Sequence, residues 1–346
     1  MDIKTIIDYL GSYDGSKLRL MEVCGSHTQA IAKFGIRDIL SPDIELISGP
    51  GCPVCVTPTD YIDRLIELCL IPGNCVATFG DLLRVPGSQE SLNEAKGRGG
   101  QVAMLYSPME VLALAQEHPD INYIFAAVGF ETTAPVYTLL LDETIRLGLQ
   151  NVKLLTALKT MPGAISYLLD NGADIDGFIA PGHVCAITGS DYFRGLAERY
   201  HIPFAVSGFQ DQELLIAIYG LVQMAVAGQA EVRNYYTSVV ENEPNQLAQT
   251  KLNQYFTEYA PVWRGMGPIP GSGLILRDEY SAFDAGSAGL NADNARNKAC
   301  RCGQILMGKA KPADCPLFGT ACTPLNPQGA CMVSMEGSCF AAYSCK

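Results

Sequence analysis

The chain has 346 residues and a mass of 37.2 kDa, enough for two or three domains that each bury a core. Charged residues make up only 17%, against a usual share of about 25%, which argues against a disordered or coiled-coil protein. The net charge of −12 disfavours sequence-independent binding to nucleic acid or to an anionic membrane surface. The start lacks a signal-peptide pattern and no apolar stretch is long enough to span a bilayer, so we expect a cytosolic protein with reduced thiols.

Short apolar runs recur along the first two thirds of the chain, and each ends in a turn that bears Gly or Pro. Such runs predict buried strands, which we place at 45–48, 75–79, 102–106, 123–128, 153–157, 177–180 and 204–207. Helical patterns separate them, and the sequence Ser-Pro-Met-Glu at 107–110 predicts a capping box at one helix start. Alternating strands and helices favour parallel βαβ units, and a further strand is expected at 273–277.

The pattern predicts an α/β protein with two doubly wound domains and a small third region. We place the first domain at 16–148, with both N-terminal cysteine-bearing turns, and the second at 149–260. Residues 261–346 show little periodicity, and we expect this region to pack with residues 1–15 and to be organised by something other than an apolar core. In open α/β sheets the ligand crevice lies beyond the carboxyl ends of the strands, where the unusual turns of this sequence fall.

Three N-terminal cysteines fall in glycine-bearing turns at predicted strand ends. Cys24 lies in MEVCGSHTQ, and Cys52 and Cys55 form the C-P-V-C of GPGCPVCVTP. A C-x-x-C between a strand and a helix is typical of a redox or metal-binding pair, because a helix N-terminus favours thiolate. Alone, Cys24 is most simply a core residue and His27 a structural histidine. We nevertheless expect Cys24 to approach the C-P-V-C turn, with His27 nearby as a proton donor or a partner of the ligands.

The C-terminal tail is dense in cysteine, and seven of the 13 cysteines lie in the last 47 residues. Soft thiolates bind zinc, Cu(I) or iron–sulfur clusters, and the tail lacks the C-x2-4-C spacing usual for zinc. An iron–sulfur cluster is therefore favoured, while a zinc site and a set of buried free thiols stay open as alternatives. Spacing alone does not decide which four of the seven would hold a cluster.

Other common sites are absent from the sequence. No HExxH, GxSxG or strand-led GxGxxG occurs, so the usual metallopeptidase, serine hydrolase and dinucleotide-binding interpretations are weak. Cys69 and Cys75 sit within apolar patterns and are expected in the core. The role of Cys185, which follows His183 in a turn, stays open.

Nearly end to end, the sequence resembles the HypD family of hydrogenase-maturation factors. The resemblance rests on MEVCGSHT, GPGCPVCVTP, TFGDLLRVPGS, AAVGFETTAP, APGHVCAITG, SGFQDQELL, WRGMGPIPGSGL and the cysteine tail. It implies two Rossmann-like domains, a region with a [4Fe–4S] cluster, and a redox-active scaffold on which the Fe(CN)2CO group of [NiFe]-hydrogenases is assembled. It also implies a stable complex with the small chaperone HypC and transient contact with HypE, the cyanide donor.

The resemblance also implies roles for individual cysteines. The family's cluster spacing is similar to C-x14-C-x6-C-x16-C, which here selects Cys300, Cys315, Cys322 and Cys339. Cys302 and Cys331 then correspond to the family's redox-active pair, and Cys345 has no counterpart. The functional thiols of the family, expected to hold the iron cargo or stabilise bound cyanide, are matched by Cys24, Cys52 and Cys55.

Two other hypotheses share part of this evidence. A [4Fe–4S]-dependent protein disulfide reductase without iron cargo would need Cys52 and Cys55 but not Cys24. A zinc-stapled structural protein would need only the tail. Whether the chain is an enzyme stays open, since accepting cyanide on a scaffold would be only transferase-like.

Overall fold

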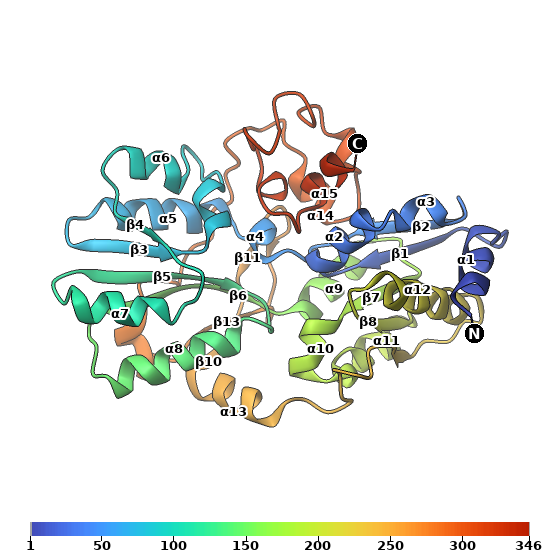
Figure 1. Ribbon diagram of the computed structural model, residues 1–346, viewed down its shortest axis with the longest axis horizontal. Helices are drawn as coiled ribbons and strands as arrows, with labels where there is room; N and C mark the ends of the chain where they lie inside the picture. The colour runs from blue at the N-terminus through green and yellow to red at the C-terminus, as the bar shows by residue number, and fades with distance from the viewer. Residues whose placement is uncertain (1, 346) are drawn as a thin grey trace.

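The predicted strands form two mostly parallel sheets that lie side by side, with α14 (Cys302–Leu306) and α15 (Ser338–Ser344) above them (Figure 1). The computed structural model describes residues 2–345. Every strand expected from the sequence is present within a few residues of its predicted bounds, which confirms the α/β class. Among the described residues, none of the helices has the length and apolar character needed to span a bilayer.

The first sheet is entirely parallel, with the strand order β2-β1-β7-β8-β9. Its strands are β1 (Leu18–Glu22), β2 (Ile44–Ser48), β7 (Gly177–Pro181), β8 (Phe204–Ser207) and β9 (Val232–Asn234). The helices around it are α1 (Ile3–Gly11), α2 (Gly25–Lys33), α3 (Ile36–Ile39), α9 (Met161–Asp170), α10 (Gly182–Thr188), α11 (Arg194–Tyr200) and α12 (Asp211–Val226), with the 3-10 turn η2 (Ser190–Phe193). Its central strands are buried on both faces, as the continuous apolar runs predict.

The second sheet has the order β10-β13-β6-β5-β3-β4, and β13 runs antiparallel to both of its neighbours. Its strands are β3 (Asn74–Thr78), β4 (Val102–Met104), β5 (Asn122–Gly129), β6 (Val152–Lys159), β10 (Phe256–Tyr259) and β13 (Gly273–Leu276). Its helices are α5 (Thr59–Leu70), α6 (Leu92–Gly97), α7 (Glu110–Glu117), α8 (Ala134–Arg146) and α13 (Gln246–Tyr255), with the 3-10 turns η1 (Gly80–Arg84) and η3 (Asp278–Phe283).

The capping box expected at residues 107–110 forms only in part. The Glu110 carboxylate accepts from the Ser107 N–H at 2.7 Å, as a box requires. The Ser107 hydroxyl, however, accepts from the N–H of Met109 at 3.3 Å, and the helix α7 begins later, at Glu110. The carboxylate therefore caps a turn that precedes the helix.

Each sheet is assembled from separate stretches of the chain. The chain crosses between the sheets at residues 49–73, 160–176 and 235–255, so residues 16–148 contribute strands to both. The sheets thus divide the chain differently from the expected boundary at 148/149. The first crossing begins with the C-P-V-C turn and the short helix α4 (Pro53–Val56), which places these thiols between the two sheets.

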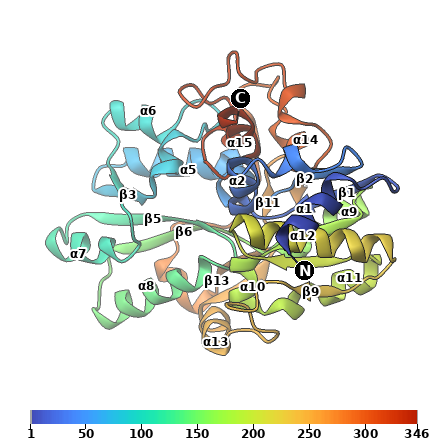
Figure 2. The same ribbon diagram turned by 45° about the vertical axis from the view of Figure 1, so that its right-hand side comes forward.

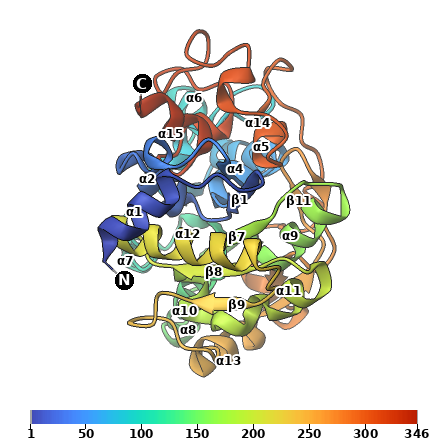
Figure 3. The same ribbon diagram turned by 90° about the vertical axis from the view of Figure 1, so that its right-hand side faces the viewer.

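The C-terminal region has short elements joined by turns, as its weak periodicity predicts. These are a small ribbon of β11 (Val262–Trp263) and β12 (Gly267–Pro268), the helices α14 (Cys302–Leu306) and α15 (Ser338–Ser344), and the 3-10 turns η4 (Pro312–Asp314) and η5 (Ala330–Met332). In the turned views α14 and α15 stay above α2 (Figures 2 and 3), and α15 packs on α2. Residues 2–15 lie elsewhere than expected, since α1 packs against α12 and α3 and buries Ile6 and Leu10 there.

Candidate functional site

The two N-terminal cysteine-bearing turns lie next to each other at the carboxyl ends of β1 and β2. These strands pair in parallel, so the chain leaves both at the same edge of the sheet. The N–H of Gly25 donates to the carbonyl oxygen of Gly51 at 2.9 Å. Gly51 packs so closely on Cys24 that a β-carbon on it would lie 2.3 Å from the Cys24 nitrogen. Only glycine fits this approach.

Replacing Gly51 by Ala should therefore separate the two turns. Overpacking of this kind costs about 1–3 kcal/mol, so the free energy of unfolding of Gly51→Ala, measured by urea denaturation, should fall by that amount. Gly195→Ala is the matched control, because a β-carbon there meets no atom within 4 Å and lies in α11, where Ala is preferred. Equal stability of the two variants would contradict the close packing of the turns.

Cys24 lines a cavity of about 170 Å³ between the two sheets. Turns after β1, β2, β5 and β7 form its walls together with the C-terminal region, and its polar wall residues are Cys24, Ser26, Thr132, Thr133, His183 and Glu336. Burial raises the pKa of the Cys24 thiol to about 12; the main-chain N–H of His27, at the start of α2, opposes this shift, and the charge of Glu336 adds to it. A thiolate at Cys24 thus needs a cation beside it.

Cys52 and Cys55 form a buried pair within one turn of chain. Cys52 caps α4 by accepting the N–H of Cys55 at 3.3 Å, and Pro53 occupies the first helical turn. Both thiols are free, and Cys55 Sγ donates to Cys52 Sγ at 2.6 Å. Burial and the neighbouring Cys52 raise the pKa of Cys55 well above its ordinary value. The pair is arranged for dithiol chemistry or for binding a soft metal ion.

Six tail cysteines gather in a second group, namely Cys300, Cys302, Cys315, Cys322, Cys331 and Cys339. All of them are buried except Cys300, which is half-buried. Cys331 Sγ donates to Cys339 Sγ at 3.1 Å, and the Gln328 N–H donates to Cys322 Sγ at 3.3 Å. Burial raises the pKa of Cys300 to about 12, and the nearby thiols of Cys302, Cys315 and Cys322 add to the shift. The seventh, Cys345, is exposed and donates to the carbonyl oxygen of Ala32 at 3.3 Å, away from the group.

The two groups of thiols meet at η5. Cys55 Sγ lies 3.9 Å from the carbonyl oxygen of Ala330, the residue before Cys331. The charges of Cys331 and Cys302 both contribute to the raised pKa of Cys55. A hydrogen bond that the Cys302 thiol donates to Cys331, followed by burial, raises the pKa of Cys302, so these two thiols are neighbours. A row of thiols therefore runs from the tail group to the C-P-V-C turn.

His27 is close to Cys24 in sequence but its ring is engaged elsewhere. Its Nε2 lies 3.2 Å and 3.0 Å from the carbonyl oxygens of Ser207 and Gly208 and so carries the hydrogen. The ring stacks on Phe209, with centroids 4.7 Å apart, and Phe209 stacks in turn on His183. Burial lowers the pKa of His27 to about 4. A neutral ring anchored to the main chain fits a structural role better than that of a proton donor.

The tail thiols are the ligand type that an iron–sulfur cluster needs. Within residues 2–345, no three His, Cys, Asp or Glu side chains converge closely enough to hold a metal ion as they stand. The chemistry of the donor set nevertheless fits, because buried thiols that raise one another's pKa become thiolates readily only beside a cation such as iron. The four thiols with cluster spacing would draw together around the iron, and the cluster itself remains a proposal.

Sequence reasoning missed two polar residues of the Cys24 cavity. Glu336 lies over the start of α2, where its Oε1 accepts from the Ser26 hydroxyl at 2.6 Å. Its position three residues before Cys339 in a cysteine-rich tail was the available signal. His183 also lines the cavity. The role of Cys185 was left open by the sequence. Burial, followed by the charges of Glu131 and Cys24, raises the pKa of Cys185, so this thiol lies near Cys24.

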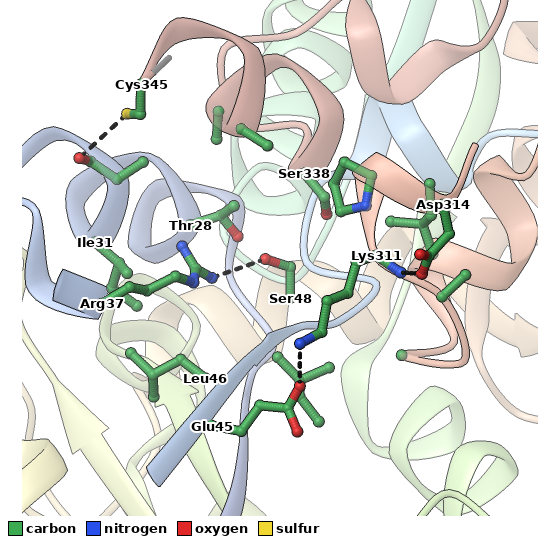
Figure 4. Close-up of a pocket in the computed structure, with 18 of the residues that line it drawn as sticks. Thr28, Ile31, Arg37, Glu45, Leu46, Ser48, Lys311, Asp314, Ser338 and Cys345 are labelled. Atoms are coloured by element: carbon green, nitrogen blue, oxygen red, sulfur yellow. Dashed lines mark hydrogen bonds and ion pairs between the residues drawn. The ribbon is translucent and has the colours of Figure 1, made fainter. Parts of the chain in front are cut away.

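A separate cavity of about 460 Å³ lies between β2 and the C-terminal region (Figure 4). Part of its charge is paired within the chain, since Lys311 Nζ lies 2.7 Å from Glu45, while Arg37 lies 3.1 Å from Glu22 and donates to Ser48 at 3.2 Å. Cys345 is the cysteine on its wall, at the far side from these pairs (Figure 4). The internal pairing fits a structural joint between the sheet and the tail.

Fold and site together define a class of protein. It is a two-sheet α/β protein in which a buried row of thiols connects a cysteine-rich C-terminal region with a cavity between the sheets. The thiol pairs suit electron transfer, and the cavity suits a small ligand that a thiolate can bind.

The chain belongs to the HypD family. The family profile described as "HypD: Hydrogenase formation hypA family" matches residues 2–346. The hydrogenase maturation factor HypD of Azotobacter vinelandii is 43% identical over 336 residues, covering 94% of this chain and 89% of the relative. HypD of Escherichia coli K12 is 43% identical over 332 residues (94% and 88%), and a putative hydrogenase expression/formation protein of Methanocaldococcus jannaschii is 41% identical over 329 residues (94% and 92%). Family membership gives the chain a role in hydrogenase maturation.

Proposed function

We propose that this chain is a scaffold on which the Fe(CN)2CO group of [NiFe]-hydrogenases is assembled with HypC, with cyanide accepted from HypE. The observation that carries the proposal is the row of thiols that ends beside a cavity already lined by another thiol, Cys24. A disulfide reductase has use for Cys52 and Cys55 but leaves Cys24 without a task. Iron cargo gives all three thiols one role.

The iron is the substrate of this site. Thiolates of Cys24, Cys52 and Cys55 would bind it, and its positive charge offsets the burial that now raises the pKa values of Cys24 and Cys55. HypC would supply a further thiolate. Cyanide bound to iron accepts hydrogen bonds at nitrogen, and the cavity wall offers donors in His183 and the hydroxyl groups of Thr132 and Thr133.

The tail keeps this site reduced. Cys300, Cys315, Cys322 and Cys339 would hold a [4Fe–4S] cluster, which supplies electrons one at a time when bound. The short helix α4, which carries Cys55, packs on η5, which carries Cys331, so thiol–disulfide exchange with the Cys302/Cys331 dithiol would reduce an oxidised Cys52–Cys55 pair. In that exchange one S–S bond breaks and another forms. Two electrons and two protons then return Cys302 and Cys331 to thiols.

Anaerobic co-purification with HypC tests the proposal. The complex should be brown, contain about four cluster irons and four sulfides per chain, and show infrared bands of iron-bound cyanide and carbonyl. A brown complex without cyanide bands would instead support the disulfide reductase, for which the close Cys52–Cys55 pair is the favouring observation. A colourless protein containing zinc would overturn both proposals.

A further inference from the structure

A large hollow opens beside the tail thiols. Its volume is about 630 Å³, and Cys300, Cys302 and Gly329 lie in its wall. The charged residues of the wall are four basic side chains and one acidic one, namely Arg264, Arg296, Lys298, Arg301 and Asp293. This basic hollow is notable in a chain whose net charge is −12.

Most of its positive charge has no internal counterpart. Arg296 pairs with Glu94 at 3.1 Å. In contrast, Lys298 and Arg301 are exposed and make no ion pair with any residue from 2 to 345. Arg264 donates from Nε to the carbonyl oxygen of Thr57 at 2.7 Å, but its Nη2 is buried and has no acceptor in the part of the chain that the structure describes. Lys298 and Arg301 therefore present charge to something outside the chain, while the buried Arg264 adds positive charge to the wall.

The hollow also reaches the tail thiols, because Cys300 and Cys302 line it. Cys300 is the one member of the six-cysteine group that is not fully buried. The main chain of Gly329 packs on Cys300 so closely that a β-carbon on residue 329 would lie 2.7 Å from Cys300 Sγ. An electron donor bound over this hollow would thus stand next to a proposed cluster ligand.

We propose that the basic hollow, through its exposed Lys298 and Arg301, is the docking site of a small acidic protein that donates single electrons. This inference rests on the proposed function, in which the tail carries a cluster. Each docking oxidises the donor by one electron, and two such events with two protons from water regenerate the Cys302/Cys331 dithiol. A small anion is the weaker occupant, because Lys298 and Arg301 are exposed and charges in water bind a single small anion only weakly.

Stopped-flow reduction of the cluster-loaded protein tests the docking site, with reduced plant-type [2Fe–2S] ferredoxin as the acidic probe. Electrostatic steering changes association rates by about 10- to 1,000-fold. The second-order rate constant should therefore fall at least about tenfold in the Lys298→Glu/Arg301→Glu variant, and it should fall similarly in wild type as salt screens the charges. Lys4→Glu/Lys33→Glu, the same charge change on α1 and α2, should keep the wild-type rate.

Controls separate the possible failures. Reduced methyl viologen, a small cation, should reduce the cluster of Lys298→Glu/Arg301→Glu at least as fast as that of wild type, which shows that the cluster is intact. Equal ferredoxin rates in both double variants would overturn the docking site while leaving the proposed function in place. Inhibition by inorganic phosphate at constant ionic strength, with no effect of the charge reversals, would also overturn it in favour of a small-anion site. Failure to load any cluster would instead defeat the proposed function.

Discussion

Replacing Cys24 by Ala should abolish the infrared bands of iron-bound cyanide while the absorbance of the tail cluster persists. Cys24 lies in the cavity between the sheets, whereas the six-cysteine group lies beyond the C-P-V-C turn. Removing one of three thiolate ligands from a buried site leaves the iron without the negative charge that makes its binding favourable. Cys52→Ala and Cys55→Ala should give the same result, because each removes another ligand of the same iron.

The matched control is Cys69→Ala. Cys69 is buried like Cys24, but it lies in the core of the second sheet, where its thiol donates to the carbonyl oxygen of Ile66 at 3.2 Å. This variant tests the loss of a buried thiol without touching the cavity, and it should retain the cyanide bands. Full-strength bands in Cys24→Ala would disprove the three-thiol site and favour the disulfide reductase, which has no use for Cys24.

The strands were predictable from sequence because a buried parallel strand leaves a continuous apolar run. Residues 123–128 are such a run, and β5 occupies the centre of its sheet. The pairing of strands was not predictable in the same way. β1 pairs with β7, more than 150 residues later, and no local pattern records that partner. The expected boundary at 148/149 followed chain order, whereas the sheets exchange segments.

The same limit applies to the candidate site. The cysteine-bearing turns were expected at strand ends, and β1 and β2 bring Cys24 and Gly51 together there because they are neighbours in one sheet. The surroundings of His27 were hidden, since its ring contacts Ser207, Gly208 and Phe209, about 180 residues away. Glu336 reaches Ser26 across an even longer separation. Local motifs therefore identified the thiols but not what surrounds them.

Replacing Cys315 by Ser should remove the tail cluster and loosen the C-terminal region. This region has few regular elements, so the cluster is expected to be a main source of its order. In this variant the iron and sulfide content should fall to background, and the visible absorbance of the cluster should vanish. Limited proteolysis should cut the C-terminal region first. Cys345→Ser is the control that should keep all four cluster irons, because its exposed thiol lies apart from the group.

Cys302→Ser should give the complementary result, a brown protein that no longer supports maturation. The Cys302 thiol donates a hydrogen bond to Cys331, and η5, which carries Cys331, packs on α4, which carries Cys55, so this pair lies between the tail group and the C-P-V-C turn. Without it, electrons should reduce the cluster but leave an oxidised Cys52–Cys55 pair unreduced, which thiol alkylation and mass spectrometry detect. If the Cys52–Cys55 disulfide of Cys302→Ser were reduced as fast as that of wild type, electrons would bypass this pair and the relay would be wrong.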